Sequence, residues 1–277
     1  MTAAATAPVL DYASRTDPGL RREVNEDAVL AQDPCFLVAD GMGGHEAGDR
    51  ASRAAIDVFV ELLAAGAGPL GLGEVETAIE NARYAVADIA RHSARGAGCT
   101  LTGVVRVEHE GEPFWYVLNV GDSRVYLHRG TELTQLTADH SLREELLARG
   151  ITDADTTPRN VITRALGSED PRHDAWLLPI QTGARLLICS DGLTTELSDA
   201  ELLAVLTVGG RPASVADELL RRACESGGRD NISLIVVDTV SGGSGEGAGA
   251  RPWETGTVGP TGADDDTLER TLPGRHR

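Results

Sequence analysis

The stretch F-W-Y-V-L-N-V-G-D-S-R-V-Y-L-H, residues 114–128, decides how the central part of this chain folds. Two runs rich in β-branched and aromatic residues, Phe114–Val120 and Arg124–His128, are separated only by Gly121-Asp122-Ser123. A crossover helix needs many more residues, so a turn of hairpin length predicts strands that run antiparallel. The middle of the sheet is therefore expected to be antiparallel rather than built from βαβ units.

Further strands and helices are predicted on both sides of this stretch. Val-, Leu- and Ile-rich runs predict strands at Ala28–Gln32, Cys35–Ala39, Cys99–Val107, Leu186–Cys189 and Ile232–Val237. Helical periodicity predicts helices at Ala47–Ala65, Val75–Ala94, Leu142–Arg149, Asp199–Val208 and Ser214–Glu225. Helices grouped before and after antiparallel strands predict an α+β fold, a four-layer α-β-β-α sandwich of two mainly antiparallel sheets flanked by helix pairs.

A length of 277 residues suits one large domain followed by a tail. We predict a disordered N-terminus at residues 1–8, a folded domain at 9–240 and a disordered, Gly-rich tail at 241–277. Residues 137–174 are the most polar part of the domain, and we expect them to run over its surface.

The composition excludes several classes of function. All 25 Lys or Arg positions are arginine, which excludes chemistry that needs a lysine ammonium group. A net charge of −18 argues against general binding to nucleic acid or to an anionic membrane. The 4 cysteines lie far apart and are interpreted as reduced residues of a cytoplasmic protein. No apolar window is long enough to span a membrane.

Several predicted strands carry an acidic residue beside a small residue at one end. The segments are F-L-V-A-D-G at Phe36–Gly41, Y-V-L-N-V-G-D-S-R at Tyr116–Arg124, L-L-I-C-S-D-G-L at Leu186–Leu193, G-R-D-N-I-S-L-I-V-V at Gly228–Val237 and N-E-D at Asn25–Asp27. Any single Asp-Gly after a strand is usually a turn. Several converging carboxylates would repel one another, however, and a bound cation offsets that repulsion. Together the segments predict a metal site.

Oxygen ligands of this kind favour magnesium or manganese over zinc, because the sequence holds no H-E-x-x-H motif and no Cys/His cluster. Two such cations about 3.5–4 Å apart clamp the attacking and leaving oxygens of a phosphoryl transfer. They also make bound water a nucleophile near neutral pH. The acidic segments therefore indicate metal-assisted phosphoryl transfer.

Between about Asp11 and Asp238 the chain resembles the metal-dependent protein serine/threonine phosphatases of the type 2C family, in their bacterial form. The resemblance rests on stretches in the expected order: S-R-T-D-P-G-L-R-R-E-V-N-E-D (Ser14–Asp27), V-A-D-G-M-G-G-H-E-A-G (Val38–Gly48), G-C-T-L-T (Gly98–Thr102), N-V-G-D-S-R (Asn119–Arg124), R-N-V-I-T-R-A-L-G (Arg159–Gly167), C-S-D-G-L (Cys189–Leu193) and G-R-D-N-I-S (Gly228–Ser233). It implies hydrolysis of phosphoserine and phosphothreonine on proteins by direct attack of a metal-bridging water.

The resemblance also implies a role for each residue of these motifs. The metal ligands would be Asp40, which bridges two manganese or magnesium ions, the Gly41 carbonyl, Glu26 through water, Asp191 and Asp230. Asp122, together with Asp191, would hold a weaker third ion, with Asn160 as a further contact. Asp27 would orient the attacking water, and Arg22 would bind phosphate. Residues 137–174 correspond to the family's flap beside the active site.

One position departs from the pattern of the animal enzymes, in which a histidine two residues after the bridging aspartate acts as general acid. Here that position is Met42. His45 and a water on the third ion are the alternative proton donors. For His140, a turn or a helix cap beside Ser141 is the preferred interpretation, and contact with substrate is the alternative.

The implied partners are phosphorylated proteins, among them a Ser/Thr kinase whose action the enzyme opposes in the cytoplasm as a monomer. A relative specialised for one regulator and a catalytically silent phosphoprotein-binding module are the competing interpretations. In the tail, Thr267 follows three acidic residues. Phosphorylated Thr267 could dock a forkhead-associated module, although a solvated terminus is the simpler interpretation.

Overall fold

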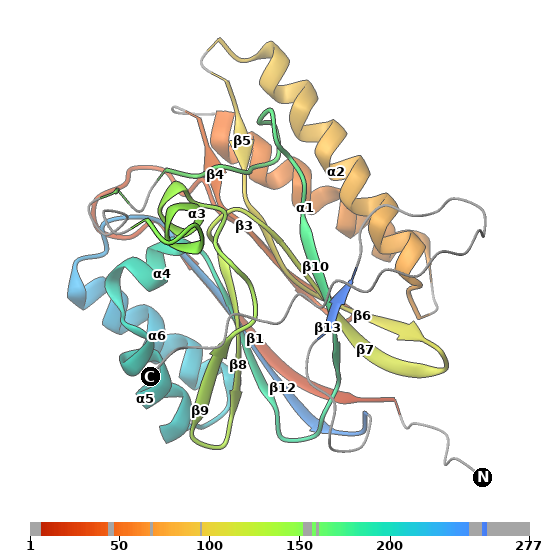
Figure 1. Ribbon diagram of the computed structural model, residues 1–277. Coiled ribbons are helices and arrows are strands. Elements are labelled where there is room, and N and C mark those ends of the chain that lie inside the picture. Colours follow the sequence, from red (N-terminus) through yellow and green to blue (C-terminus); the bar gives the residue numbers. More distant parts are fainter. Residues whose placement is uncertain are drawn as a thin grey trace.

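Two sheets stack face to face, and helices cover the outer face of each (Figure 1). The computed structural model describes residues 7–43, 47–66, 69–94, 96–151, 157–158, 161–243 and 251–253. Every ladder between named strands in this part of the chain is antiparallel. The arrangement confirms the predicted α+β sandwich.

The strands form two large sheets and one small one. The five-stranded sheet has the order β1 (Val9–Asp17), β12 (Ile232–Ser241), β11 (Arg185–Cys189), β8 (Arg124–Arg129) and β9 (Glu132–Gln135). The six-stranded sheet has the order β13 (Arg251–Trp253), β10 (Asp174–Pro179), β7 (Glu112–Val120), β6 (Leu101–His109), β3 (Cys35–Ala39) and β2 (Ala28–Gln32). Two short strands, β4 (Gly41–Met42) and β5 (Gly98–Cys99), pair with each other.

Two groups of helices form the outer layers. α1 (Ala47–Ala65) and α2 (Leu72–His92) pack on the six-stranded sheet. α4 (Asp191–Glu196), α5 (Asp199–Val208) and α6 (Pro212–Ser226) pack on the five-stranded sheet. The short α3 (Leu142–Ala148) belongs to neither group and lies in the predicted flap, beside α4 in the view of Figure 1. No helix in the described ranges is both long and apolar enough to cross a membrane.

The run C-F-L-V-A of β3 shows why the core has three layers. All five residues are buried, but alternate side chains point to opposite faces of a strand. Leu37 packs among the side chains that lie under α1 and α2. Phe36 and Val38 instead pack against the five-stranded sheet, in a cluster with Trp115 and Ile235. A continuous apolar run is therefore what a strand covered on both faces requires.

The observed elements extend and correct the predicted ones. Predicted and observed bounds agree for α1, α5, β2 and β3. The strands β1, β9 and β10 and the helix α4 were not predicted. The turn at Gly121–Ser123 also differs from the hairpin that we expected, because β7 and β8 belong to different sheets. That turn carries the chain across the sandwich.

The tail differs from the prediction in the part that the structure describes. We predicted disorder from residue 241, but Ser241 is the last residue of β12 and Arg251–Trp253 form β13. Trp253 pairs with Ala175 of β10, and its ring lies 5.6 Å from that of His109. Thr267 lies outside the described residues.

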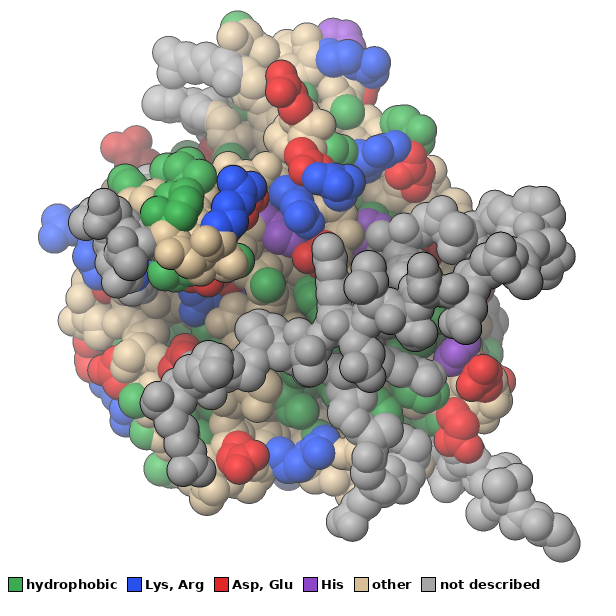
Figure 2. All heavy atoms as spheres, viewed as in Figure 1, with side chains coloured by type: hydrophobic (Ala, Val, Ile, Leu, Met, Phe, Trp, Pro, Cys, Tyr) green, Lys and Arg blue, Asp and Glu red, His purple; other side chains and the backbone are tan. Residues whose placement is uncertain are grey.

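Acidic and basic side chains are interspersed on the face seen in Figure 2. Ion pairs between surface side chains include Arg172 with Asp170 at 2.7 Å and Arg91 with Asp88 at 2.7 Å.

Candidate active site

Strand register brings the predicted acidic residues of the six-stranded sheet together. Ala28 at the start of β2 lies opposite Ala39 at the end of β3. Asp27, just before β2, is therefore next to Asp40, just after β3. The backbone N–H of Asp40 donates a hydrogen bond of 2.9 Å to Thr100 Oγ1, which fixes the chain at this point.

The five-stranded sheet adds two more carboxylates at the same end of the sandwich. Cys189 at the end of β11 pairs with Leu234 near the start of β12. Asp191 and Asp230 lie just beyond these strands, so the register brings them together. Asp122 follows β7 in the turn that connects the sheets, and Asp191 is the carboxylate that raises its pKa most.

Glycines allow the backbone to come this close. A Cβ atom on Gly41 would lie 2.4 Å from the carbonyl oxygens of Glu26 and Gly48. A Cβ atom on Gly192 would lie 1.9 Å from the carbonyl oxygen of Asn231. Backbone atoms cannot yield to such contacts, which is why Asp-Gly pairs recur at the ends of these strands.

A cleft of about 520 Å³ opens where these strand ends meet. Its lining includes all but one of the predicted site residues that the structure describes, namely Arg22, Glu26, Asp40, Gly41, Asp122, Asp191 and Asp230, together with Met42, Ile162 and Asn231. Asp27 is the exception: it is buried and accepts a hydrogen bond of 2.9 Å from Ser190 Oγ. Asn160 and His45 lie outside the described residues.

Burial makes the carboxylates difficult to ionise. It is the largest cause that raises the pKa of Asp27 to about 7 and that of Asp122 to about 8. Burial and the charges of neighbouring aspartates also raise the pKa values of Asp40 and Asp191. The cleft therefore has a strong need for positive charge.

The donor atoms of the cleft fit a hard divalent cation. Asp27 Oδ1 and Asp122 Oδ1 are buried and have no hydrogen-bond partner among the described residues. Such oxygens are costly unless a cation or its bound water satisfies them. No three His, Cys, Asp or Glu side chains in the described ranges form a ready cage for a metal. An ion such as Mg²⁺ suits this arrangement, because it keeps several water ligands.

Arg22 lies at the mouth of the cleft, where its Nη2 atom is 2.8 Å from Asp230 Oδ2. Its side chain is 50% exposed, and its guanidinium group can therefore be reached by a ligand that enters from solvent. A planar guanidinium group can bind two phosphate oxygens at once. The position of Arg22 suits recognition of a phosphate group above the carboxylates.

Three polar residues that support the site were not predicted. Asn231 accepts a hydrogen bond from the Glu26 N–H at 2.9 Å and donates to the carbonyl oxygens of Pro18 and Val24. Ser190 and Thr100 hold Asp27 and Asp40, as described above. For Asn231, its place directly after Asp230 was the one available signal. Single polar residues such as Ser190 and Thr100 carry no pattern that reveals their partners.

Comparison with known proteins agrees with this geometry. The family described as Protein phosphatase 2C matches residues 21–228. A serine/threonine phosphatase of Listeria innocua is 36% identical over 240 residues, which cover 81% of this chain and 94% of the relative. The serine/threonine protein phosphatase PstP of Mycobacterium tuberculosis is 35% identical over 274 residues, which cover 96% of this chain and 51% of that longer protein.

Solved structures show the same similarity. The catalytic domain of PstP, crystallised with 2 manganese ions, matches with a TM-score of 0.75 and 34% sequence identity. The match covers 85% of this chain and 100% of that structure. Sequence, fold and the acidic cleft thus lead to one conclusion: the chain belongs to the protein phosphatase 2C family, whose bacterial members named here are serine/threonine phosphatases.

Proposed function

We propose that this protein phosphatase cleaves phosphoserine and phosphothreonine esters of proteins in the cleft that Asp40, Asp191 and Asp230 line. The observation that carries this assignment is the convergence of buried carboxylates with raised pKa values at one end of both sheets. So many acidic groups are stable together in ionised form only when cations neutralise them.

Asp40, the Gly41 carbonyl, Asp191 and Asp230 would hold two manganese or magnesium ions, with Glu26 taking part through water. Asp122 and Asp191 would hold a third, weaker ion. When bound, such ions supply positive charge for the phosphate oxygens and make water a stronger nucleophile near neutral pH. The manganese ions bound by the catalytic domain of PstP support metal dependence here, and the number of ions is part of the proposal.

Arg22 would bind the phosphate group and orient its phosphorus toward the carboxylates. When the Arg22 guanidinium group leaves Asp230 to bind phosphate, it keeps a charged hydrogen-bond partner. Asp27 would orient the attacking water through Oδ1, because Ser190 already occupies Oδ2. Attack of the water oxygen on phosphorus then breaks the bond to the serine or threonine oxygen, with no phosphoenzyme.

Met42 lines the cleft, and its thioether carries no proton to donate. The proton for the leaving oxygen must therefore come from another group.

The expected substrates are proteins phosphorylated by Ser/Thr kinases, including a kinase itself. Four free cysteines support activity in the reducing cytoplasm.

Hydrolysis of a phosphothreonine peptide, with manganese, magnesium or EDTA, tests this proposal. We expect turnover with either metal, none in EDTA, and a loss of at least about 100-fold in Asp40→Asn and Asp191→Asn. Asp57→Asn, on the exposed face of α1, is the matched control and should keep wild-type turnover. Full activity of both cleft variants would contradict the assignment. An inactive wild type that still binds manganese would instead indicate a phosphoprotein-binding module.

A further inference from the structure

His140 is almost fully buried beside the turn that carries Asp122, and it holds that turn from two sides. Its ring atom Nδ1 accepts a hydrogen bond of 3.1 Å from the backbone N–H of Gly121. Its own backbone N–H donates a hydrogen bond of 2.9 Å to the Gly121 carbonyl oxygen. Both polar backbone groups of Gly121 are therefore bound by one residue.

The opposite side of the turn is fixed as well. Gly121 has a φ angle of +110°, and a Cβ atom there would lie 2.5 Å from the Thr100 side chain. Asn119 Nδ2 donates to the carbonyl oxygens of Gly121 at 3.1 Å and Ala138 at 2.9 Å. Gly121 is thus confined between Thr100 and His140, which leaves the following residue little freedom of position.

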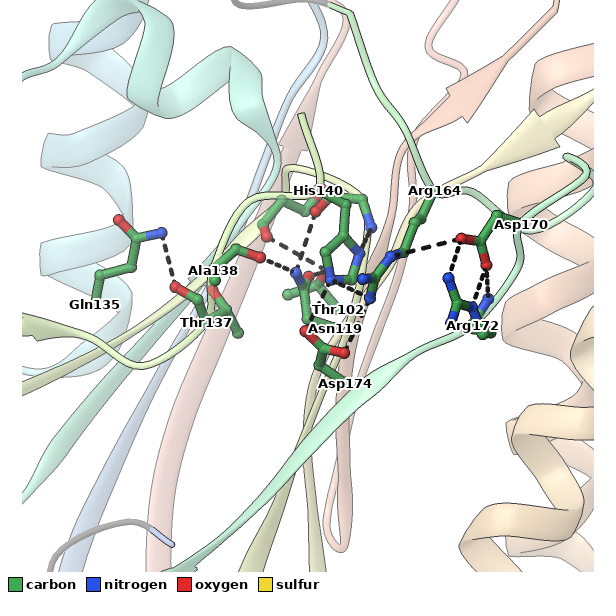
Figure 3. Close-up of polar contacts among 12 residues, drawn as sticks. Thr102, Asn119, Gln135, Thr137, Ala138, His140, Arg164, Asp170, Arg172 and Asp174 are labelled. Carbon is green, nitrogen blue, oxygen red and sulfur yellow. Dashed lines mark hydrogen bonds and ion pairs between the residues drawn. The ribbon is translucent and has the colours of Figure 1, made fainter. Parts of the chain in front are cut away.

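A second set of contacts orients the His140 ring. Because Nδ1 accepts from Gly121, the proton of the neutral ring is on Nε2, which lies 3.1 Å from Asp174 Oδ2. Arg164 Nη1 lies 3.0 Å from the other oxygen of Asp174. Figure 3 shows His140, Arg164 and Asp174 pointing toward one another. The backbone N–H of Thr163 also donates to the His140 carbonyl oxygen at 2.8 Å.

Asp122 depends on this turn for its place in the cleft. Its Oδ1 atom is buried without a hydrogen-bond partner among the described residues, so no side chain fixes that oxygen directly. The position of the carboxylate is therefore set mainly by the backbone of the Gly121–Asp122 turn. A group that holds Gly121 therefore fixes the backbone from which the Asp122 side chain extends.

We propose that His140 is a positioning residue for the Asp122 carboxylate and thereby sets the affinity of the weaker cation that Asp122 would hold. The inference rests on the role proposed for Asp122. Helix capping does not account for His140, because Ser141 is the N-cap of α3 and accepts a hydrogen bond from the Glu144 N–H. Residues that orient metal ligands typically change metal affinity about 10- to 100-fold when they are replaced.

Calorimetric titration of manganese into metal-free protein tests the proposal without relying on turnover. We expect His140→Phe to weaken the lower-affinity phase about 10- to 100-fold and to leave the tighter phase unchanged. His140→Asn should restore most of that affinity, because its Oδ1 can replace Nδ1 as acceptor for Gly121. His92→Phe, at an exposed position of α2, is the matched control and should leave both phases unchanged.

Turnover of p-nitrophenyl phosphate gives a second readout. His140→Phe should lower kcat while KM stays near the wild-type value, since Arg22 is not altered. Asp122→Asn should abolish the weaker manganese phase of the titration. The double variant that adds His140→Phe should have the same kcat as Asp122→Asn alone. Additive losses in the double variant would overturn the proposal. A weaker phase that survives in Asp122→Asn would instead refute the role of Asp122 itself.

A folding defect can be separated from loss of positioning. If His140→Phe fails to show cooperative thermal unfolding, the manganese affinities of His140→Asn and His140→Gln are compared instead to test the proposal. Asn keeps an acceptor near Gly121, whereas the amide of Gln reaches toward Asp174 instead. The proposal requires stronger manganese binding in the Asn variant, and stronger binding in the Gln variant would overturn it.

Discussion

The ion pair between Arg22 and Asp230 joins the residue proposed to bind phosphate to one of the proposed metal ligands. At 2.8 Å it satisfies a carboxylate that is 35% exposed and an arginine that is 50% exposed. A cation bound to Asp230 would weaken the ion pair between Asp230 and Arg22, because the cation and the guanidinium group compete for the same carboxylate oxygens. The guanidinium group would then be available for phosphate.

Replacing Arg22 by Ala should lower kcat/KM for a phosphothreonine peptide about 10- to 100-fold. The loss corresponds to one or two charge-assisted hydrogen bonds to phosphate. Arg21, which also lines the cleft, provides the matched control. Steady-state kinetics should show less than about a threefold loss in Arg21→Ala. Equal losses in the two variants would indicate a general charge effect and contradict specific phosphate binding by Arg22.

That the acidic residues meet in one cleft could be predicted, because each one stands beside a strand end, a position that sequence patterns reveal. His140 could not be interpreted in this way. Its ring bonds to Gly121 and Asp174, which lie 19 and 34 residues away in the chain. Such contacts exist only after the sheets have assembled, so local patterns favoured a turn or cap.

Elements with strong local patterns were also the ones predicted with correct bounds. α1 and β3 have a clear apolar face or a continuous apolar run. β1 was missed because most of its side chains are partly exposed and show no alternation. β10 was missed because it follows the polar flap and ends in Pro179. Whether neighbouring strands share a sheet, as β7 and β8 do not, is decided by packing.

The strand β13 ties a tail segment to the edge of the six-stranded sheet. Trp253 packs against the core beneath α2. Burial raises the pKa of Glu76, but hydrogen bonds from His173, Tyr116 and Trp253 hold it below its usual value. This polar cluster connects α2, β7, the residue before β10 and the tail strand.

Removing residues 244–277 should therefore lower the free energy of unfolding by about 1–3 kcal/mol, the scale of burying one large side chain. Removing only residues 254–277 keeps Trp253 and should change it by less than about 0.5 kcal/mol. Urea denaturation of the two truncated proteins measures the difference. Equal stability of both would show that β13 contributes nothing to the fold.

At the scale of the whole molecule, the acidic cleft adds to a net charge of −18. Folding raises the pKa of Asp27 from 3.8 to about 7 and that of Asp122 from 3.8 to about 8. Between the unfolded and folded pKa values of each group, the folded protein binds more protons than the unfolded chain. Stability due to these groups is thus present below about pH 4 and is lost as the pH rises through 7 to 8.

Metal-free protein should therefore melt at a lower temperature at pH 8 than at pH 5.5. Saturating manganese should raise the melting temperature most at pH 8, because bound metal requires ionised carboxylates. Calorimetric melts in EDTA and in manganese measure both effects. In EDTA, Asp122→Asn should make the melting temperature depend less steeply on pH. A melting temperature that rises with pH in EDTA would contradict the account.

Anomalous diffraction at the manganese absorption edge, from crystals grown with manganese, tests the central claim most directly. The account predicts two strong peaks in the cleft among Asp40, the Gly41 carbonyl, Asp191 and Asp230, and a weaker third peak beside Asp122. Asp122→Asn crystals should lose the third peak and keep the first two. Strong peaks elsewhere on the molecule, with none in the cleft, would contradict the assignment of the metal site.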